Sequence, residues 1–132
     1  MKLVNIKILV ATHKQYWMPE DSVYMPIHVG REGKVDIGYT GDHTGDNISS
    51  KNANYCELTG LYWAWKNLKD VDYIGLCHYR RYFDLSPKKY IFKHIESDSI
   101  TWECFVKTPS TLDFADVFTQ SDVILPTARV FD

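Results

Sequence analysis

The stretch Asp72-Tyr73-Ile74-Gly75-Leu76-Cys77 predicts a buried β-strand that continues directly into His78-Tyr79-Arg80-Arg81-Tyr82-Phe83. A short apolar run of this kind is typical of a strand in a parallel sheet, where both faces are covered. The sudden change to histidine and arginine predicts that the strand ends there, with cationic side chains at its carboxyl end.

A similar pattern lies near the N-terminus, where Ile6–Ala11 predicts a first buried strand that stops abruptly at Thr12-His13-Lys14. Between the two strands, apolar residues recur at helical spacing and predict a helix that ends between Asn67 and Asp70. Its expected apolar face consists of Tyr55, Leu58, Leu61, Tyr62, Trp65 and Leu68. The candidates for its N-terminal cap are the capping-box pair Asn54 and Glu57 or, for an earlier start, Ser49 or Ser50.

The rest of the chain carries weaker signals. Residues 15–38, which are interrupted by prolines and glycines, predict a loop with at most short extended pieces. Helical pieces are expected over residues 88–95 and 112–119, and Asp122–Pro126 predicts a third short strand that ends in Thr127-Ala128-Arg129. Strands that alternate with a helix and long crossovers predict an α/β fold with a partly parallel sheet and flanking helices.

Length and composition limit the classes of protein. The 132 residues suffice for a single α/β domain, residues 1–132, and the chain stops after the third expected strand without a closing helix. We therefore expect the front part of a larger domain. A hydrophobic fraction of 45% excludes a disordered chain, and a net charge of -2 argues against a nucleic-acid partner.

The compartment is predicted from absences in the sequence. No apolar run approaches the roughly 20 residues of a membrane-spanning helix, and the N-terminus does not read as a signal peptide. The 3 cysteines form no CxxC pair, which excludes a zinc ribbon. The sequence predicts a cytoplasmic protein, with peripheral association at the inner face of the membrane left open.

The carboxyl ends of parallel strands meet at one edge of a sheet, which is where α/β proteins bind ligands. This places cationic and hydrogen-bonding side chains together and predicts a site for a phosphate or diphosphate. The residues expected there are Thr12, His13, Lys14, His78, Tyr79, Arg80 and Arg81, with Thr127 and Arg129 from the third strand and Tyr16, Trp17 and Tyr82 as stacking rings. In the structural alternative, the arginines pair with Asp84 or Glu57 and the histidines belong to the core.

Two further groups of residues have more than one interpretation. In the polar loop of residues 41–47, Asp42 and Asp46 either bond their own turn or contact a sugar or ribose. At the start of the predicted helix, Lys51, Asn52 and Asn54 lie where anions are favoured. Asp70-Val71-Asp72 spells a metal-binding motif of sugar transferases, but it precedes its strand and so belongs to the opposite edge. No metal-ligand residues are predicted.

Three stretches resemble a bacterial family of glycosyltransferases found in capsular and exopolysaccharide gene clusters and long labelled a domain of unknown function. They are residues 8–14, residues 41–60 (GDHTGDNISSKNANYCELTG) and residues 72–83 (DYIGLCHYRRYF). The resemblance implies a GT-A-like transferase of a nucleotide-diphospho-sugar. Family members are longer, so it also implies that this chain is the N-terminal, donor-binding part of such an enzyme.

What the resemblance implies about mechanism can be combined with the strand ends. Thr12, His13, Lys14 and Tyr79 are expected near the nucleotide, and His78, Arg80 and Arg81 at the departing diphosphate as the catalytic group. The donor sugar is expected at Asp42, Asp46, Asn52, Asn54 and Glu57. The arginines can replace a metal, although Mg or Mn as a cofactor stays open. The implied partners are a nucleotide-sugar donor and a glycan or glycolipid acceptor, with self-association left open.

Two other classes of function remain alternatives. A non-catalytic nucleotide- or carbohydrate-binding module predicts ligand binding without turnover. A phosphate-ester hydrolase with His78 as nucleophile predicts the release of inorganic phosphate from simple esters.

Overall fold

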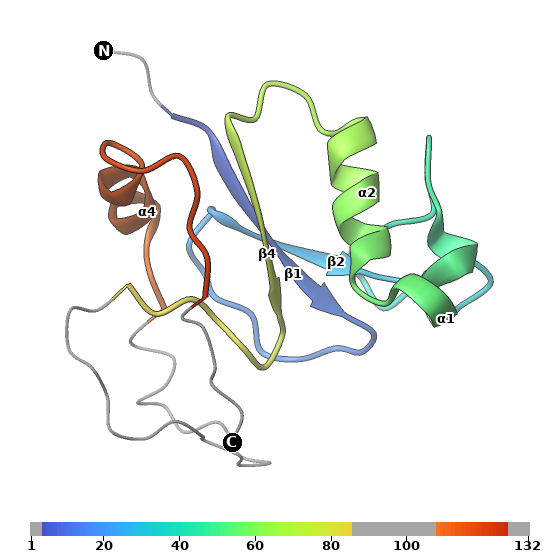
Figure 1. Cartoon of the computed structure of the whole chain (residues 1–132). Helices are drawn as coiled ribbons and strands as arrows, with labels where there is room; N and C mark the ends of the chain where they lie inside the picture. Colours follow the sequence, from blue (N-terminus) through green and yellow to red (C-terminus); the bar gives the residue numbers. More distant parts are fainter. Residues whose placement is uncertain (1–3, 86–107, 127–132) are drawn as a thin grey trace, which may run out of the picture. The chain divides into compact units, whose positions relative to one another are not determined.

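The computed structural model describes residues 4–85 and 108–126 of the chain, which divides into two compact units, residues 1–82 and residues 83–132 (Figure 1). The elements of the first unit are β1 (Ile6–Thr12), β2 (Tyr24–His28), β3 (Thr40–Gly41), a 3-10 helix (Ser49–Lys51), α1 (Asn52–Tyr55), α2 (Leu58–Asn67) and β4 (Tyr73–His78). The second unit holds α4 (Thr111–Val117).

The strands form one parallel sheet in the order β3-β2-β1-β4, so β1 lies in the centre (Figure 1). Ala11 of β1 is paired with Ile27 of β2 on one side and with His78 of β4 on the other. The predicted α/β fold with a partly parallel sheet is confirmed. The carboxyl ends of β1, β2 and β4 therefore lie side by side.

The core of the first unit lies between one face of this sheet and α2. Leu9, Ala11 and Ile27 are fully buried and pack in one cluster with Trp63 and Ala64 of the helix. The helix approaches the sheet closely at Gly60, where a Cβ atom would lie 2.8 Å from Cγ1 of Val29. Small residues on this face of α2 therefore set the spacing between helix and sheet.

The predicted apolar face of the helix is only partly right, because Leu61 and Leu68 pack against the core but other members do not. The structure buries Thr59, Gly60, Trp63 and Ala64, whereas Trp65 is 66% exposed and Leu58 is 52% exposed. The predicted single helix is also divided, because Cys56 has a φ of +51° and separates α1 from α2. Close approach to the sheet favours small side chains over large ones, and hydrophobic periodicity alone does not register this.

None of the predicted N-terminal caps forms. Neither α1 nor α2 has a side-chain hydrogen bond at its N-cap, so the capping box of Asn54 and Glu57 is wrong. Ser49 is buried, and its hydroxyl donates to Asp42. Asp42 thus takes the hydroxyl that the sequence assigns to a helix cap.

A strand interrupts the loop that the sequence predicts over residues 15–38. β2 pairs with β1 along its length, even though Pro26 stands in its middle. β3 pairs only with Ile27 and His28, so the first three residues of β2 form a sheet edge. A proline is tolerated at an edge, where no neighbouring strand needs its missing N–H group.

The second unit confirms one predicted element and contradicts another. α4 corresponds to the predicted helical piece of residues 112–119 and begins one residue earlier. Ser110 and Asp113 form a full capping box at its start. The described residues 121–126 form no strand, and Val123 and Leu125 are 65% and 78% exposed, so the predicted third strand is wrong. The predicted helical piece over residues 88–95 lies outside the described residues, as do Thr127 and Arg129.

Within residues 4–85 and 108–126, no helix has both the length and the apolar character needed to cross a membrane.

Candidate functional site

The candidate site lies where β1 and β4 end at the carboxyl edge of the sheet. Because Ala11 is paired with His78, the residues that follow each strand emerge next to each other. The backbone N–H of Tyr79 donates to the carbonyl oxygen of Ala11 at 3.1 Å and extends this pairing by one residue. The structure therefore brings His13 and Lys14 next to the segment from His78 to Arg81.

The ring of Tyr79 is the centre of this site. Tyr79 is only 2% exposed, and its ring contacts those of His78 at 4.3 Å, Tyr16 at 4.9 Å and His13 at 5.6 Å between centroids. The contacts with Tyr16 and His13 are edge-on, a geometry that aromatic rings favour. A buried tyrosine thus holds side chains from two strand ends in place.

Two cations lie over the same ring. Nζ of Lys14 is 5.6 Å from the centroid of Tyr79 and 5.7 Å from that of Tyr16, and Cζ of Arg80 is 5.4 Å from that of Tyr79. Cation–π contacts of exposed groups contribute only about 0.5–1 kcal/mol, so both charges remain available to an anion. We call this set of residues the Tyr79 cluster: His13, Lys14, Tyr16, His78, Tyr79 and Arg80.

Over residues 4–85, the structure lacks one of the two pairings that the structural alternative offers, that of the arginines with Glu57. Within the described part of the first unit, neither Arg80 nor Arg81 forms an ion pair with Glu57. Arg81 closes a tight turn through its backbone, because its N–H donates to the carbonyl oxygen of His78 at 2.8 Å and its own carbonyl accepts from His78 at 3.2 Å. Its side chain is exposed beside the cluster.

His78 is held in the neutral form. Burial lowers the pKa of His78, the positive charges of Arg80, Arg81 and His13 lower it further, and Glu57 opposes them. Nδ1 of His78 accepts the backbone N–H of Arg80 at 3.3 Å, which leaves the ring proton on Nε2. This tautomer is suited to donating a hydrogen bond to a ligand and poorly suited to nucleophilic attack.

Thr12 shapes the turn that carries Lys14. Its hydroxyl donates to the carbonyl oxygen of Lys14 at 2.6 Å and accepts the N–H of the same residue at 3.2 Å. Thr12 is 1% exposed, so its side chain is engaged in this turn. Thr12 is predicted to contact a ligand, but in the structure its hydroxyl positions the backbone of Lys14.

Asp42 departs from its predicted contact with a sugar. It is fully buried, and its carboxylate accepts from the hydroxyls of Ser49 and Thr59 at 2.5 and 2.6 Å and from the N–H groups of Gly30 and Arg31 at 2.8 and 3.1 Å. Burial alone raises the pKa of Asp42, but these hydrogen bonds outweigh it and lower the pKa below its usual value. Asp42 is an ionised structural residue with no oxygen left for a ligand.

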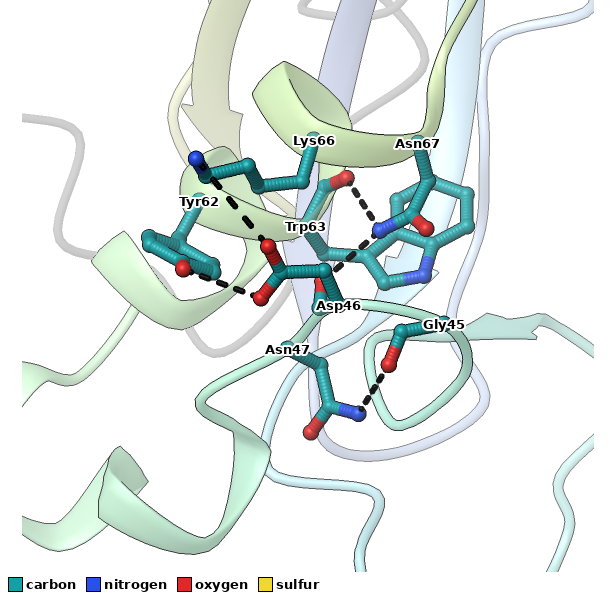
Figure 2. A network of polar contacts seen from close by, with 7 residues as sticks. All are labelled: Gly45, Asp46, Asn47, Tyr62, Trp63, Lys66 and Asn67. Atoms are coloured by element: carbon teal, nitrogen blue, oxygen red, sulfur yellow. Dashed lines mark hydrogen bonds and ion pairs between the residues drawn. The ribbon is translucent and has the colours of Figure 1, made fainter.

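Asp46 belongs to a surface network that holds a loop against α2 (Figure 2). Tyr62 donates to Oδ1 of Asp46 at 3.0 Å, Nζ of Lys66 lies 4.0 Å from Oδ2, and the amide of Asn67 donates to the Asp46 carbonyl at 2.9 Å. Tyr62 lies in the middle of the helix and Lys66 and Asn67 at its end, whereas Glu57 lies at its beginning. Asp46 therefore stabilises the loop at a different part of the helix from Glu57.

The remaining predicted sugar contacts differ among themselves. Asn52 is engaged locally, because its amide donates to the carbonyl of Cys56 at 2.8 Å and to the hydroxyl of Thr59 at 3.1 Å. Asn54 is exposed on α1. Glu57 is half-buried and close enough to His78 to act on its pKa, so the structure adds Glu57 to the edge of the Tyr79 cluster.

The expected stacking rings fall into two groups. Tyr16 packs on Tyr79, whereas Tyr82 packs on Trp17 and Tyr24 with centroids 6.2 and 5.9 Å apart. The hydroxyl of Tyr82 has no hydrogen-bond partner among the described residues, and burial raises the pKa of this phenol. Tyr82 is thus part of a buried aromatic group.

His28 is a residue at the same sheet edge that the sequence analysis does not identify. It ends β2, is paired with Thr12 of β1, and is 2% exposed. Neither of its ring nitrogens has a hydrogen-bond partner among the described residues. The sequence could have placed His28 at this edge only if residues 24–28 had been predicted as a strand, which Pro26 argues against.

The Asp70-Val71-Asp72 motif lies before β4, at the opposite edge from the Tyr79 cluster, as the sequence predicts. Asn5 anchors it, because its N–H donates to Oδ2 of Asp72 at 2.8 Å and its amide to the carbonyl of Asp70 at 2.6 Å. In residues 4–85 and 108–126, no three His, Cys, Asp or Glu side chains gather as a metal site would require.

Comparison with known proteins places the chain in a family. No curated protein matches it at a significant level. The chain is similar to a solved structure described as the apo form of the bifunctional glycosyltransferase WbbM, with 36% identity and a TM-score of 0.70 over 83% of this chain. It spans 21% of the length of that protein. The family model described as domain of unknown function DUF4422 matches residues 7–132, and the chain therefore belongs to this family.

Proposed function

We propose that this chain is the donor-binding part of a glycosyltransferase, which transfers a sugar from a nucleotide-sugar to an acceptor. The observation that carries the proposal is the Tyr79 cluster, where Lys14 and Arg80 offer positive charge at the carboxyl edge of a parallel sheet and form no ion pair within the described residues. The similarity to a bifunctional glycosyltransferase supports it from a second direction. Because the chain spans a fifth of that protein, we propose only two roles for these residues: binding of the donor and stabilisation of the departing diphosphate.

The proposed chemistry follows from the charges. In sugar transfer, the bond between the anomeric carbon and the diphosphate oxygen breaks, and the diphosphate leaves with the electron pair while the acceptor oxygen bonds to the carbon. Lys14, Arg80 and Arg81 would bind that diphosphate and stabilise its growing negative charge. The Nε2 proton of His78 supplies a hydrogen bond without adding a full charge.

The sugar contacts of the proposal are narrower than those expected from the sequence. Asp42 and Asn52 are engaged in internal hydrogen bonds, and Asp46 is bound to α2. We assign the donor sugar to Glu57 and Asn54, which lie at the beginning of α2 and on α1. Tyr16, which is half-buried and packs on Tyr79, would support a nucleoside or sugar ring.

The acceptor is proposed from the family resemblance. A growing surface polysaccharide or its lipid-linked precursor fits a transferase at the inner face of the membrane, and the chain is proposed to act there. Mg or Mn is proposed only as an addition to the cationic cluster. Whether the chain associates with itself is decided by a measurement of its molecular mass in solution.

A thermal-shift screen against UDP, GDP, CMP and their sugar conjugates, with and without Mn, tests this proposal. A donor raises the melting temperature with its concentration, because it stabilises the folded state by mass action. We expect one nucleotide class to do so without Mn. Stabilisation without any transfer to acceptor glycans favours the binding module instead. No shift with any nucleotide contradicts the proposed donor site.

A further inference from the structure

The side chain of Tyr39 attaches the loop that carries Lys14 to a distant part of the chain. The hydroxyl of Tyr39 accepts the backbone N–H of Tyr16 at 3.2 Å and donates to the carbonyl oxygen of the same residue at 3.0 Å. One phenol thereby satisfies both backbone groups of Tyr16, much as a neighbouring strand would. This pair of bonds fixes the backbone of Tyr16 and hence the direction of its ring.

The direction of the Tyr16 ring matters because it forms one side of the Tyr79 cluster. The ring packs edge-on against Tyr79, and Nζ of Lys14 lies at almost the same distance from both rings. If Tyr16 turns away, Lys14 loses one of the two rings that hold its ammonium group. The position of the Lys14 charge therefore depends on the backbone of Tyr16.

Tyr39 itself is held by the sheet and by a turn. The next two residues, Thr40 and Gly41, form β3 and pair with the end of β2. Before it, the N–H of Gly38 donates to Oδ1 of Asp36 at 2.8 Å, and Gly38 has a φ of +89°, a conformation that side chains other than hydrogen disfavour. Sheet and turn together aim the phenol at Tyr16.

A second tie joins the same two segments. Nε2 of Gln15 donates to the carbonyl oxygen of Ile37 at 3.0 Å. Thr12 holds the other side of Lys14 through its hydroxyl. The turn of Lys14 is thus fixed from the sheet by Thr12 and from the loop of residues 36–39 by Gln15 and Tyr39.

We propose that Tyr39 is a positioning residue for anion binding at the Tyr79 cluster. It contacts Tyr16 and acts through that residue, by holding the loop in the form that keeps Lys14 at the Tyr79 ring. This inference rests on the proposed function, since it assumes that the cluster binds a diphosphate. It adds a residue that lies outside every stretch from which the site was derived.

Calorimetric titration with inorganic diphosphate tests the proposal in four proteins: the wild type, Tyr39→Phe, Lys14→Ala and the double variant. Tyr39→Phe keeps the ring and removes the hydroxyl, and we expect it to weaken binding roughly three- to tenfold, the range of one lost hydrogen bond. In the Lys14→Ala background the same change should have little effect, because the charge that Tyr39 positions is absent. Equal losses in both backgrounds mean a merely structural role and overturn the proposal.

Tyr62→Phe is the matched control. It also removes one phenol hydroxyl with a hydrogen bond, but that bond joins α2 to Asp46 in the loop of residues 41–47. We expect diphosphate affinity to be unchanged in Tyr62→Phe. A loss equal to that of Tyr39→Phe would assign the effect to general destabilisation and overturn the proposal.

A measurement without ligand separates this inference from the proposed function. In the NMR spectrum of the wild type, we expect nuclear Overhauser contacts between the Lys14 side chain and the Tyr79 ring, and their loss in Tyr39→Phe. Unchanged contacts overturn the role of Tyr39 even if diphosphate binds. Lost contacts together with no diphosphate binding to the wild type leave Tyr39 as the residue that positions Lys14, but refute the anion site.

Discussion

Asp42 stabilises the first unit through a buried carboxylate that accepts hydrogen bonds from two backbone N–H groups and two hydroxyls. Asp42→Ala leaves those donors buried without an acceptor, and we expect it to lower the free energy of unfolding by about 3–5 kcal/mol. Asp46→Ala is the control, because that side chain is 58% exposed and its ion pair with Lys66 contributes at most about 1 kcal/mol. Urea denaturation measures both, and similar losses would contradict the structural role of Asp42.

His28 makes stability depend on pH. Burial lowers the pKa of His28 below its ordinary value of 6.5, nearby Arg31 and Lys34 lower it further, and Asp42 and Asp36 oppose them. The unfolded chain therefore binds a proton at a higher pH than the folded chain, so stability is complete above about pH 6.5 and falls as the pH drops below it. His78 acts in the same direction.

The test is the slope of unfolding free energy against pH between about pH 5 and 6.5, in the wild type and in His28→Gln. Glutamine does not titrate, so we expect a smaller slope in the variant. Its packing cost shifts the whole curve and leaves the slope unaffected. A slope equal to that of the wild type would show that His28 takes up its proton equally in both states.

At the scale of elements, the contact between α2 and the sheet depends on Gly60. Alanine favours a helix by about 1 kcal/mol over glycine, but its Cβ would lie 2.8 Å from Cγ1 of Val29. We expect Gly60→Ala to destabilise the protein by about 1–3 kcal/mol, because a packed core does not yield easily to an added methyl group. Thermal and urea unfolding give this value.

Val29→Ala provides the partner of a double-mutant cycle. It removes the Cγ1 atom that the new methyl group would meet, so Gly60→Ala should be neutral or stabilising in that background. If Gly60→Ala lowers the free energy of unfolding equally with valine and with alanine at position 29, the contact with Val29 is not the cause of the destabilisation.

The same elements show what sequence patterns can and cannot predict. β1 and β4 could be predicted, since their apolar runs end abruptly in polar residues. β2 could not, because Pro26 contradicts a strand unless the sheet edge is known. The buried face of α2 could not either, since Gly60 and Ala64 pack against the sheet with Trp63, whereas the large residues Leu58 and Trp65 are exposed. The hydrophobic pattern of a helix reports how apolar its side chains are, whereas the distance between helix and sheet depends on how large they are.

For the candidate site, the sequence predicted which strand-end residues lie close together, while their role in binding stays a prediction. His13, Lys14, His78, Tyr79 and Arg80 come together because parallel pairing aligns the carboxyl ends of β1 and β4. Asp42 was indistinguishable from a ligand-binding aspartate, since its donors come from residues up to 17 positions away. Tyr39 and His28 depend on β2 and β3, which the sequence does not predict.

At the scale of the whole molecule, the central claim is that the Tyr79 cluster binds the diphosphate of a nucleotide-sugar. The chain belongs to the DUF4422 family and spans a fifth of the length of the glycosyltransferase to which it is similar. If the claim holds, donor binding resides in this part of such a protein. The site must then bind a nucleoside diphosphate on its own.

The most direct measurement is the calorimetric titration of the wild type, Arg80→Ala and Lys69→Ala with the nucleoside diphosphate that stabilises the protein most. A charge-assisted hydrogen bond contributes about 1.5–3 kcal/mol, so we expect Arg80→Ala to weaken binding at least about tenfold. Lys69 is exposed in the connection between α2 and β4, and its removal should leave the affinity unchanged. Equal affinity in Arg80→Ala and the wild type, or equal losses in both variants, would contradict the claim.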